Sequence, residues 1–147
     1  MKTTPTKGAE TVEEMLERYV AAVRAKDVDA FVGLYADDVR TFDLWQEWTY
    51  DGKEALRGMV AGWFGSLADD EEVAVRFDDV RTQAGPDVAA ISAFTTFAAV
   101  APDGTESRSM NNRLTWVLRK DGDGSWKIVH EHTSAPAGEE GKVQLSR

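Results

Sequence analysis

The spacing of the apolar residues changes once along this chain, and that change most restricts the possible fold. Up to about residue 66, apolar residues recur mainly every three or four positions, which predicts helices. From residue 73 onward they alternate with polar residues, which predicts strands buried on one face. Helices that precede a run of strands should pack together on one face of an antiparallel sheet. The predicted fold class is therefore α+β.

Three helices are predicted in the first half. In the first, Thr11 lies three residues before Glu14, the spacing of a capping box, and the helix should end near Lys26. Asp27 or Asp29 should cap a second helix over residues 31–35. A short strand at 39–43 follows, and the capping-box spacing recurs at 51–54 before a third helix. The buried stripe of that helix consists of Leu56, Met59, Val60, Trp63 and Phe64.

Four strands are predicted in the second half, at 73–77, 88–101, 105–120 and 125–133. Gly- and Asp-rich turns at 101–104 and 121–124 separate the last three. Short turns of this kind predict an antiparallel meander. The complete predicted order is αα-β-α-ββββ.

A length of 147 residues suits one domain. We expect it to span residues 11–136, between mobile polar ends at 1–10 and 137–147. The absence of cysteine excludes disulfides and thiolate chemistry. No apolar stretch approaches the ~20 residues that a membrane span needs, and no signal peptide is evident, so we expect a cytoplasmic protein that binds no membrane.

The charge of the chain argues against nucleic acid as a partner. The net charge is −9, and the sequence has 26 Asp and Glu against 17 Lys and Arg. An acidic protein repels phosphate backbones, and no basic cluster offsets the repulsion locally. The acidic run at 69–72 is typical of a solvated loop.

Several segments resemble a known superfamily. Residues 17–22 (Glu-Arg-Tyr-Val-Ala-Ala), 27–31 and 35–38 resemble the opening of ketosteroid isomerases and SnoaL-like polyketide cyclases. Residues 126–136 (Trp-Lys-Ile-Val-His-Glu-His-Thr-Ser-Ala-Pro) are similar to the last strand of the branch that contains the calcium/calmodulin-dependent kinase association domain. The resemblance covers residues 11–136. It implies a cystatin-like, nuclear-transport-factor-2-like fold, in which a curved, mainly antiparallel sheet wraps around the N-terminal helices as a cone-shaped barrel. It also implies a small-molecule pocket and a homodimer.

The resemblance also implies a catalytic set. The tyrosine donor of ketosteroid isomerases matches Tyr19, their aspartate base matches Asp43, and their second donor, a protonated aspartate, matches Asn112. An asparagine amide can donate a hydrogen bond, although it cannot form the short bond of a neutral carboxylic acid. Structural alternatives remain for each residue: Tyr19 as a core tyrosine, Asp43 as a turn cap, and Asn112 facing solvent.

His130 and His132 are the only histidines. Strand alternation places both on one face with Trp126 and Ile128. Two imidazoles at this spacing could hold a metal if Asp43 or Glu47 supplied a third ligand, could exchange protons near neutral pH, or could form structural hydrogen bonds. We expect them to line the pocket without a metal.

Aromatic residues are dense between residues 45 and 64. Such side chains suit the mouth of a pocket for a flat apolar ligand, and they equally suit a core lid or a dimer contact. The predicted ligand-binding residues are Trp45, Trp48, Trp63, Phe64, Leu114 and Trp116. Arg108 or Arg113 could bind a ligand carboxylate, although pairing with Glu or Asp across strands is the commoner role.

Two functional hypotheses follow. The first is an isomerase, cyclase or dehydratase that needs no cofactor and acts by proton transfer on a hydrophobic carbonyl compound, with Asp43 as the base. In it, Tyr19 and Asn112 polarise the carbonyl, and His130 or His132 shuttles protons. The second is a non-catalytic ligand-binding or oligomerisation module similar to the kinase association domain. A buried Asp43 with a raised pKa favours the first hypothesis.

Overall fold

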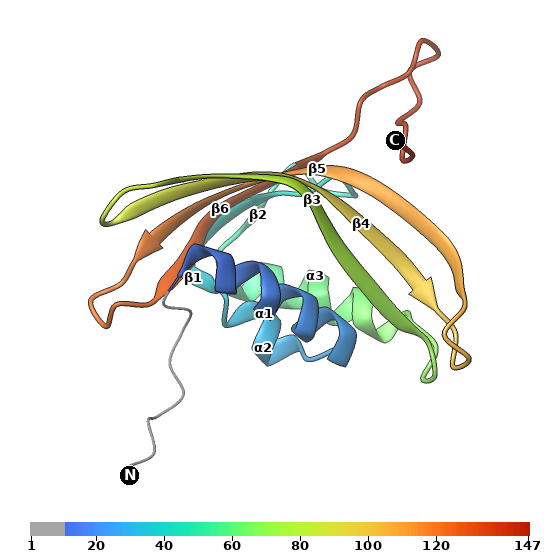
Figure 1. Cartoon of the computed structure of the whole chain (residues 1–147), viewed down its shortest axis with the longest axis horizontal. Coiled ribbons are helices and arrows are strands. Elements are labelled where there is room, and N and C mark those ends of the chain that lie inside the picture. Colours follow the sequence, from blue (N-terminus) through green and yellow to red (C-terminus); the bar gives the residue numbers. More distant parts are fainter. Residues whose placement is uncertain (1–10) are drawn as a thin grey trace.

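In residues 11–147, which the computed structural model describes, six strands form one curved sheet that arches over three helices (Figure 1). The predicted mobile end at 1–10 lies outside the described residues. The α+β class, with helices packed under a curved and mostly antiparallel sheet, is confirmed. In chain order the elements are α1 (Val12–Ala25), α2 (Val28–Val32), β1 (Tyr35–Phe42), β2 (Tyr50–Asp51), α3 (Lys53–Gly65), β3 (Glu72–Ala84), β4 (Val88–Val100), β5 (Glu106–Lys120) and β6 (Trp126–Ser134).

The strand order in the sheet is β2-β1-β6-β5-β4-β3. Strands β3 to β6 form the antiparallel meander that the turn signals predict. The first strand, β1, joins this meander beside β6 and runs parallel to it, which makes the sheet mixed. The two-residue strand β2, which the sequence pattern does not indicate, extends the sheet at the outer edge of β1.

The predicted N-terminal caps form at the first two helices. The Thr11 hydroxyl accepts the Glu14 N–H at 3.2 Å, and the α1 helix ends where Lys26 has a positive φ of 52°. Asp27, rather than Asp29, caps α2 by accepting the Ala30 N–H at 3.0 Å.

Two boundary predictions are wrong. The second helix ends at Val32, before residue 35, because Tyr35 already belongs to β1 and pairs with Ile128 of β6. No side-chain cap forms at α3, because Asp51 is engaged in β2 and Gly52, with a φ of 88°, takes the cap position. A positive φ at this point favours glycine.

The buried core fills the space between the helices and the meander. Met15 and Val23 of α1 are completely buried, as are Ile91, Trp116 and Ile128 of β4, β5 and β6. Burial of side chains of this size stabilises a fold by about 1.5–3 kcal/mol each. None of the helices within residues 11–147 is both long and apolar enough to cross a bilayer.

One extra residue in β6 changes which side chains point toward the helices. Leu118 of β5 pairs with Ile128, but the preceding Val117 pairs with His130, so Val129 has no partner on β5. A bulge of this kind shifts the inward and outward alternation of the strand by one residue.

The bulge moves the histidines to the outer face. Trp126 and Ile128 are buried before it, and Glu131 is buried after it, whereas His132 is exposed and His130 is partly exposed. The prediction that the two histidines share a face with Trp126 and Ile128 is therefore wrong. Glu131 occupies the inward position instead.

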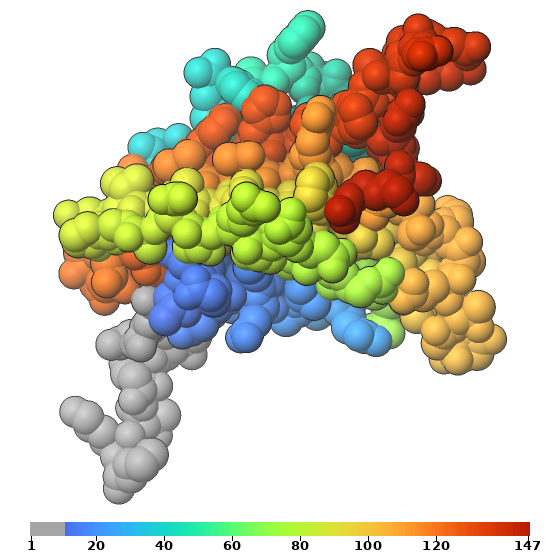
Figure 2. All heavy atoms as spheres, turned by 45° about the horizontal axis from the view of Figure 1, so that its top comes forward, coloured from blue at the N-terminus to red at the C-terminus, as the bar shows by residue number. Residues whose placement is uncertain are grey.

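The C-terminal residues lie against the outer face of the sheet (Figure 2). The Leu145 carbonyl accepts the Asn111 N–H of β5 at 2.7 Å. The Arg147 guanidinium carbon lies 3.8 Å from the centre of the Phe94 ring on β4. The segment 137–147, which we expected to be a mobile end, thus contacts both β4 and β5.

Candidate functional site

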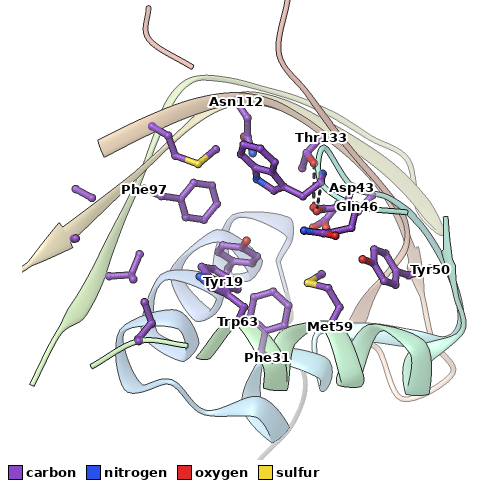
Figure 3. A pocket seen from close by; sticks show the side chains of 18 of the residues that line it. Tyr19, Phe31, Asp43, Gln46, Tyr50, Met59, Trp63, Phe97, Asn112 and Thr133 are labelled. Carbon is purple, nitrogen blue, oxygen red and sulfur yellow. Dashed lines mark hydrogen bonds between the residues drawn. The ribbon is translucent and has the colours of Figure 1, made fainter. Parts of the chain in front are cut away.

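A pocket of about 730 Å³ lies between the sheet and the helices, a size typical of small-molecule sites. Its wall is largely apolar, and a few polar groups, Asp43, Asn112, Glu131 and Thr133, reach it from the strands and from the end of β1. The apolar and aromatic residues that line it include Tyr19, Phe31, Tyr50, Met59, Trp63 and Phe97 (Figure 3).

Asp43 follows the last residue of β1 and lines the pocket. Burial raises the pKa of its carboxyl, and hydrogen bonds from the Trp45 N–H, at 3.1 Å, and the Thr133 hydroxyl, at 3.2 Å, oppose that rise. Thr133 in turn accepts the Leu44 N–H at 2.9 Å. Asp43 therefore combines the turn-capping role with a position facing the pocket.

Glu131 is the second carboxyl of the pocket, and it is only 4% exposed. Its Oε1 accepts two hydrogen bonds, from the Tyr35 hydroxyl at 2.7 Å and from the Trp116 Nε1–H at 2.8 Å. Burial raises its pKa to about 7, against the lowering effect of these two donors. A carboxyl with that pKa is about half protonated at pH 7.

The two donors also determine where the Glu131 proton resides. Oε1 already accepts two hydrogen bonds, whereas Oε2 takes part in no hydrogen bond among residues 11–147. A proton on the neutral acid therefore belongs on Oε2. Tyr35 and Trp116 come from β1 and β5, the two neighbours of β6, so the sheet itself holds the carboxyl in place.

Asp43 and Glu131 act on each other through their charges. The negative charge of Asp43 contributes to the raised pKa of Glu131. Two carboxyls in one apolar pocket disfavour double ionisation, so one tends to hold a proton while the other is charged. The pocket can therefore present a proton acceptor and a proton donor at the same pH.

Tyr19 and Asn112, the two predicted donors, both line this pocket. Burial and the nearby Glu131 and Asp43 charges raise the pKa of the Tyr19 hydroxyl well above its ordinary value, so it stays protonated. Asn112 is 8% exposed, and its Oδ1 is buried without a hydrogen-bond partner. An unpaired buried amide oxygen is costly, and a ligand O–H or N–H group can satisfy it by donating a hydrogen bond.

The predicted ligand-binding aromatics divide into two groups. Trp45 and Trp63 line the pocket. Phe64, Leu114 and Trp116 are buried in the core and are not among the residues that line it. Trp116 still affects the site, because it donates to Glu131.

Trp48 lies outside the pocket and is 95% exposed. It lines an outer groove together with His132 and Phe42, and this groove shares Asp43 and Gln46 with the pocket. The His132 ring meets the Phe42 ring edge-on at 5.5 Å.

His130 is also outside the pocket. Its Nδ1 lies 2.8 Å from the Arg40 carbonyl oxygen, and a carbonyl only accepts, so Nδ1 carries the proton and donates. The predicted shuttle role of His130 and His132 does not fit these positions. Among residues 11–147, no three His, Asp or Glu side chains are close enough to hold a metal ion together.

The sequence pattern did not single out Glu131 as a site residue. Its only signal was that it lies between two histidines in a strand, and alternation without the bulge directs it outward. Tyr50, one of the aromatic residues between 45 and 64, lines the pocket, and Met59 and Phe97 are pocket residues that were not predicted.

Comparisons with known proteins agree with this architecture. A protein of unknown function from Pseudomonas putida KT2440, called nuclear-transport-factor-2-like, has a TM-score of 0.80 and 27% identity, with 92% of each chain covered. A protein from Xanthomonas campestris designated a calcium/calmodulin-dependent protein kinase II association domain has a TM-score of 0.71 and 20% identity, covering 92% of this chain and 93% of that one. A search of curated proteins gives no match.

The structure is also similar to that of a protein designated an enzyme. A protein from Novosphingobium aromaticivorans designated an aromatic ring hydroxylase has a TM-score of 0.69 and 19% identity, with 84% of this chain and 85% of that one covered. Proteins with this fold carry unrelated functions, so the fold alone does not identify a reaction. The SnoaL-like domain matches residues 12–138. The chain therefore belongs to the SnoaL-like domain family, within the nuclear-transport-factor-2-like superfamily.

Proposed function

We propose that this chain is an enzyme that moves protons on a hydrophobic carbonyl compound, as an isomerase, cyclase or dehydratase, without a cofactor. One observation carries the proposal: Asp43 and Glu131, two carboxyls whose pKa values are raised by burial, open into the same largely apolar pocket. Acid–base groups are most effective when their pKa lies near the working pH. A buried pair of this kind is typical of a catalytic site rather than of a solvated surface.

The proposed step divides the work between the two carboxyls. Asp43, ionised, removes a proton from the carbon next to the ligand carbonyl. The electron pair of the broken C–H bond forms a C=C bond, and the carbonyl oxygen gains the negative charge. Glu131 then donates its Oε2 proton or a hydrogen bond to that oxygen, and the Tyr19 hydroxyl and the Asn112 amide are further donors. In a ketone with a neighbouring C=C bond, protonated Asp43 then returns its proton to the far carbon of that bond. The C=O bond re-forms and any proton that the oxygen received goes back to Glu131 Oε2, which completes an isomerisation.

The alternative is a non-catalytic ligand-binding or oligomerisation module. Under that hypothesis Asp43 is only a turn cap, and a solvated carboxyl would serve equally well there. The raised pKa of Asp43 and its position on the pocket wall favour the enzyme.

Hydrogen exchange in heavy water tests the proposal. Propiophenone, a simple aryl ketone, is incubated with the protein, and loss of its α-CH₂ signal is followed by NMR. We expect catalysed exchange that falls by roughly 10²–10⁴-fold in Asp43→Asn. The matched control is Asp78→Asn, which changes an exposed carboxyl on β3 and should leave the rate unchanged. Exchange that is equally fast in wild type and Asp43→Asn contradicts the proposal and favours the binding module.

A further inference from the structure

Arg108 is the only arginine or lysine among the pocket-lining residues that the structure describes. Its Nη2 lies 2.7 Å from Glu71 Oε2, and its side chain is 71% exposed. A guanidinium has five N–H donors, so this single contact leaves several of them open to another acceptor. Arg108 therefore places an available positive charge at the solvent side of the pocket.

Arg108 and Asn112 lie at two ends of one row of side chains. Both are on β5 and four residues apart, so they point to the same face of the sheet, with Met110 between them. At a strand rise of about 3.3 Å per residue, their Cα atoms are about 13 Å apart. The pocket thus has a polar inner end, an apolar middle and a cationic outer end.

The inner end disfavours a ligand group that is already negatively charged while Asp43 is ionised. Asp43 and Glu131 line it, and neither has a cationic partner among residues 11–147. An anion beside them is repelled in a largely apolar setting, whereas a neutral oxygen is not. The buried Asn112 Oδ1 has no hydrogen-bond partner and only accepts, so it points to a neutral ligand group that donates a hydrogen bond at this end.

We infer that the ligand is an elongated apolar ketone with a terminal carboxylate. The ketone oxygen lies at the inner end, where the Glu131 Oε2 proton and the Tyr19 hydroxyl can donate to it, and the carboxylate binds the Arg108 guanidinium. The fork of N–H groups matches a carboxylate with two parallel hydrogen bonds. The inference of a ketone rests on the proposed function, whereas the inference of a carboxylate rests on Arg108 alone. The repulsion at the inner end favours this orientation.

A pair of probes isolates the charge. The acid is 5-benzoylpentanoate, in which an aryl ketone is joined by four methylenes to a carboxylate, and the neutral partner is its methyl ester. Binding is followed by quenching of tryptophan fluorescence, because Trp45 and Trp63 line the pocket. The variants are Arg108→Met and, as a matched control, Arg113→Met. Arg113 lies on the same strand, is exposed, and donates to Ser134 rather than lining the pocket.

We expect wild type to bind the acid about threefold more tightly than the ester, which corresponds to one ion pair at a largely exposed side chain. Arg108→Met should remove that preference and leave ester binding unchanged, and Arg113→Met should change neither. Because the Arg108 side chain is largely exposed, Arg108→Met should fold normally. Equal binding of acid and ester by wild type, or a preference that survives Arg108→Met, overturns the inference. Failure of both probes to bind overturns it as well.

The result also separates this inference from the proposed function. Loss of exchange activity with retained acid preference contradicts catalysis and supports the carboxylate site. Active exchange on propiophenone without any preference for the acid supports catalysis and contradicts the carboxylate site.

Discussion

Replacing Glu131 with glutamine removes an ionisable group from the pocket and keeps its hydrogen bonds. The amide oxygen of Glu131→Gln can accept the same two bonds that Tyr35 and Trp116 donate at 2.7 and 2.8 Å. The amide nitrogen stands where the neutral acid carries its proton on Oε2. The variant therefore imitates the protonated carboxyl at every pH, and its comparison with wild type isolates the cost of ionising Glu131.

The size of that cost follows from the pKa of Glu131. Burial raises it from 4.5 to about 7 in the folded protein. At 1.36 kcal/mol for each pKa unit, full ionisation costs the folded state about 3 kcal/mol more than the unfolded chain. This is a large share of the ~5–15 kcal/mol by which typical domains are stable.

The sign of the pH dependence is determined by the raised pKa. Below pH 4.5 both states hold the proton, and the group does not disfavour folding. Between pH 4.5 and 7 the unfolded chain has released its proton while the folded protein still holds it, so stability falls as pH rises. Above about pH 7 both states are ionised, and the cost stays constant.

Urea unfolding at pH 5, 6, 7 and 8, followed by tryptophan fluorescence, measures this effect. We expect the free energy of unfolding of wild type, relative to Glu131→Gln, to fall by roughly 2–3 kcal/mol over this range. Glu17→Gln, which changes an exposed carboxyl on α1, is the control and should stay within about 0.5 kcal/mol of wild type at each pH. A flat difference between wild type and Glu131→Gln would refute the argument that burial holds the proton on this carboxyl.

Four further predictions concern the same region and the assembly of the chain. Asp43→Asn should have an unchanged or slightly raised Tm at pH 7, because the raised folded pKa makes the ionised carboxyl a cost above its unfolded pKa; a clear drop in Tm would show that the carboxylate is mainly a structural cap. Tyr35→Phe removes a donor that lowers the pKa of Glu131, so the pH range in which stability falls should extend to higher pH in the same urea series. Deletion of Val129 should remove the bulge and leave Glu131 inward, because Ile128 and His130 already pair with the adjacent Leu118 and Val117; the pH dependence of stability should therefore persist, and its loss would contradict Val129 as the extra residue. Light scattering should report a homodimer, twice the 16.2 kDa chain mass, as the family resemblance implies, and a monomer at all practical concentrations would exclude it.

Much of the candidate site could be predicted because it depends on local position in the chain. Tyr19 lies on the apolar stripe of α1, and Asp43 follows β1, so each reaches the space between helices and sheet. Asn112 shares the inward face of β5 with the buried Leu114 and Trp116. The family resemblance marks all three positions, and the hydrophobic periods of α1 and β5 are consistent with it for Tyr19 and Asn112.

The residues that were misplaced depend on contacts that local sequence does not encode. No glycine or proline marks the bulge at Val129, which arises from the pairing of β6 with β5 on one side and β1 on the other. It moves Glu131 into the pocket and His132 out of it. Trp48 belongs to the loop between β1 and β2, and its exposure depends on the path of that loop rather than on any period.

The sequence by itself determined the α+β class, the caps of the first two helices and the meander, because caps, turns and hydrophobic periods act over a few neighbouring residues. Only the tertiary structure decided the chemistry of the pocket. Strands far apart in sequence bring Tyr35 and Trp116 to one oxygen of Glu131, and burial among them raises its pKa. A pKa depends on solvation and on neighbouring charges in three dimensions, and neither is encoded by the order of residues along one strand.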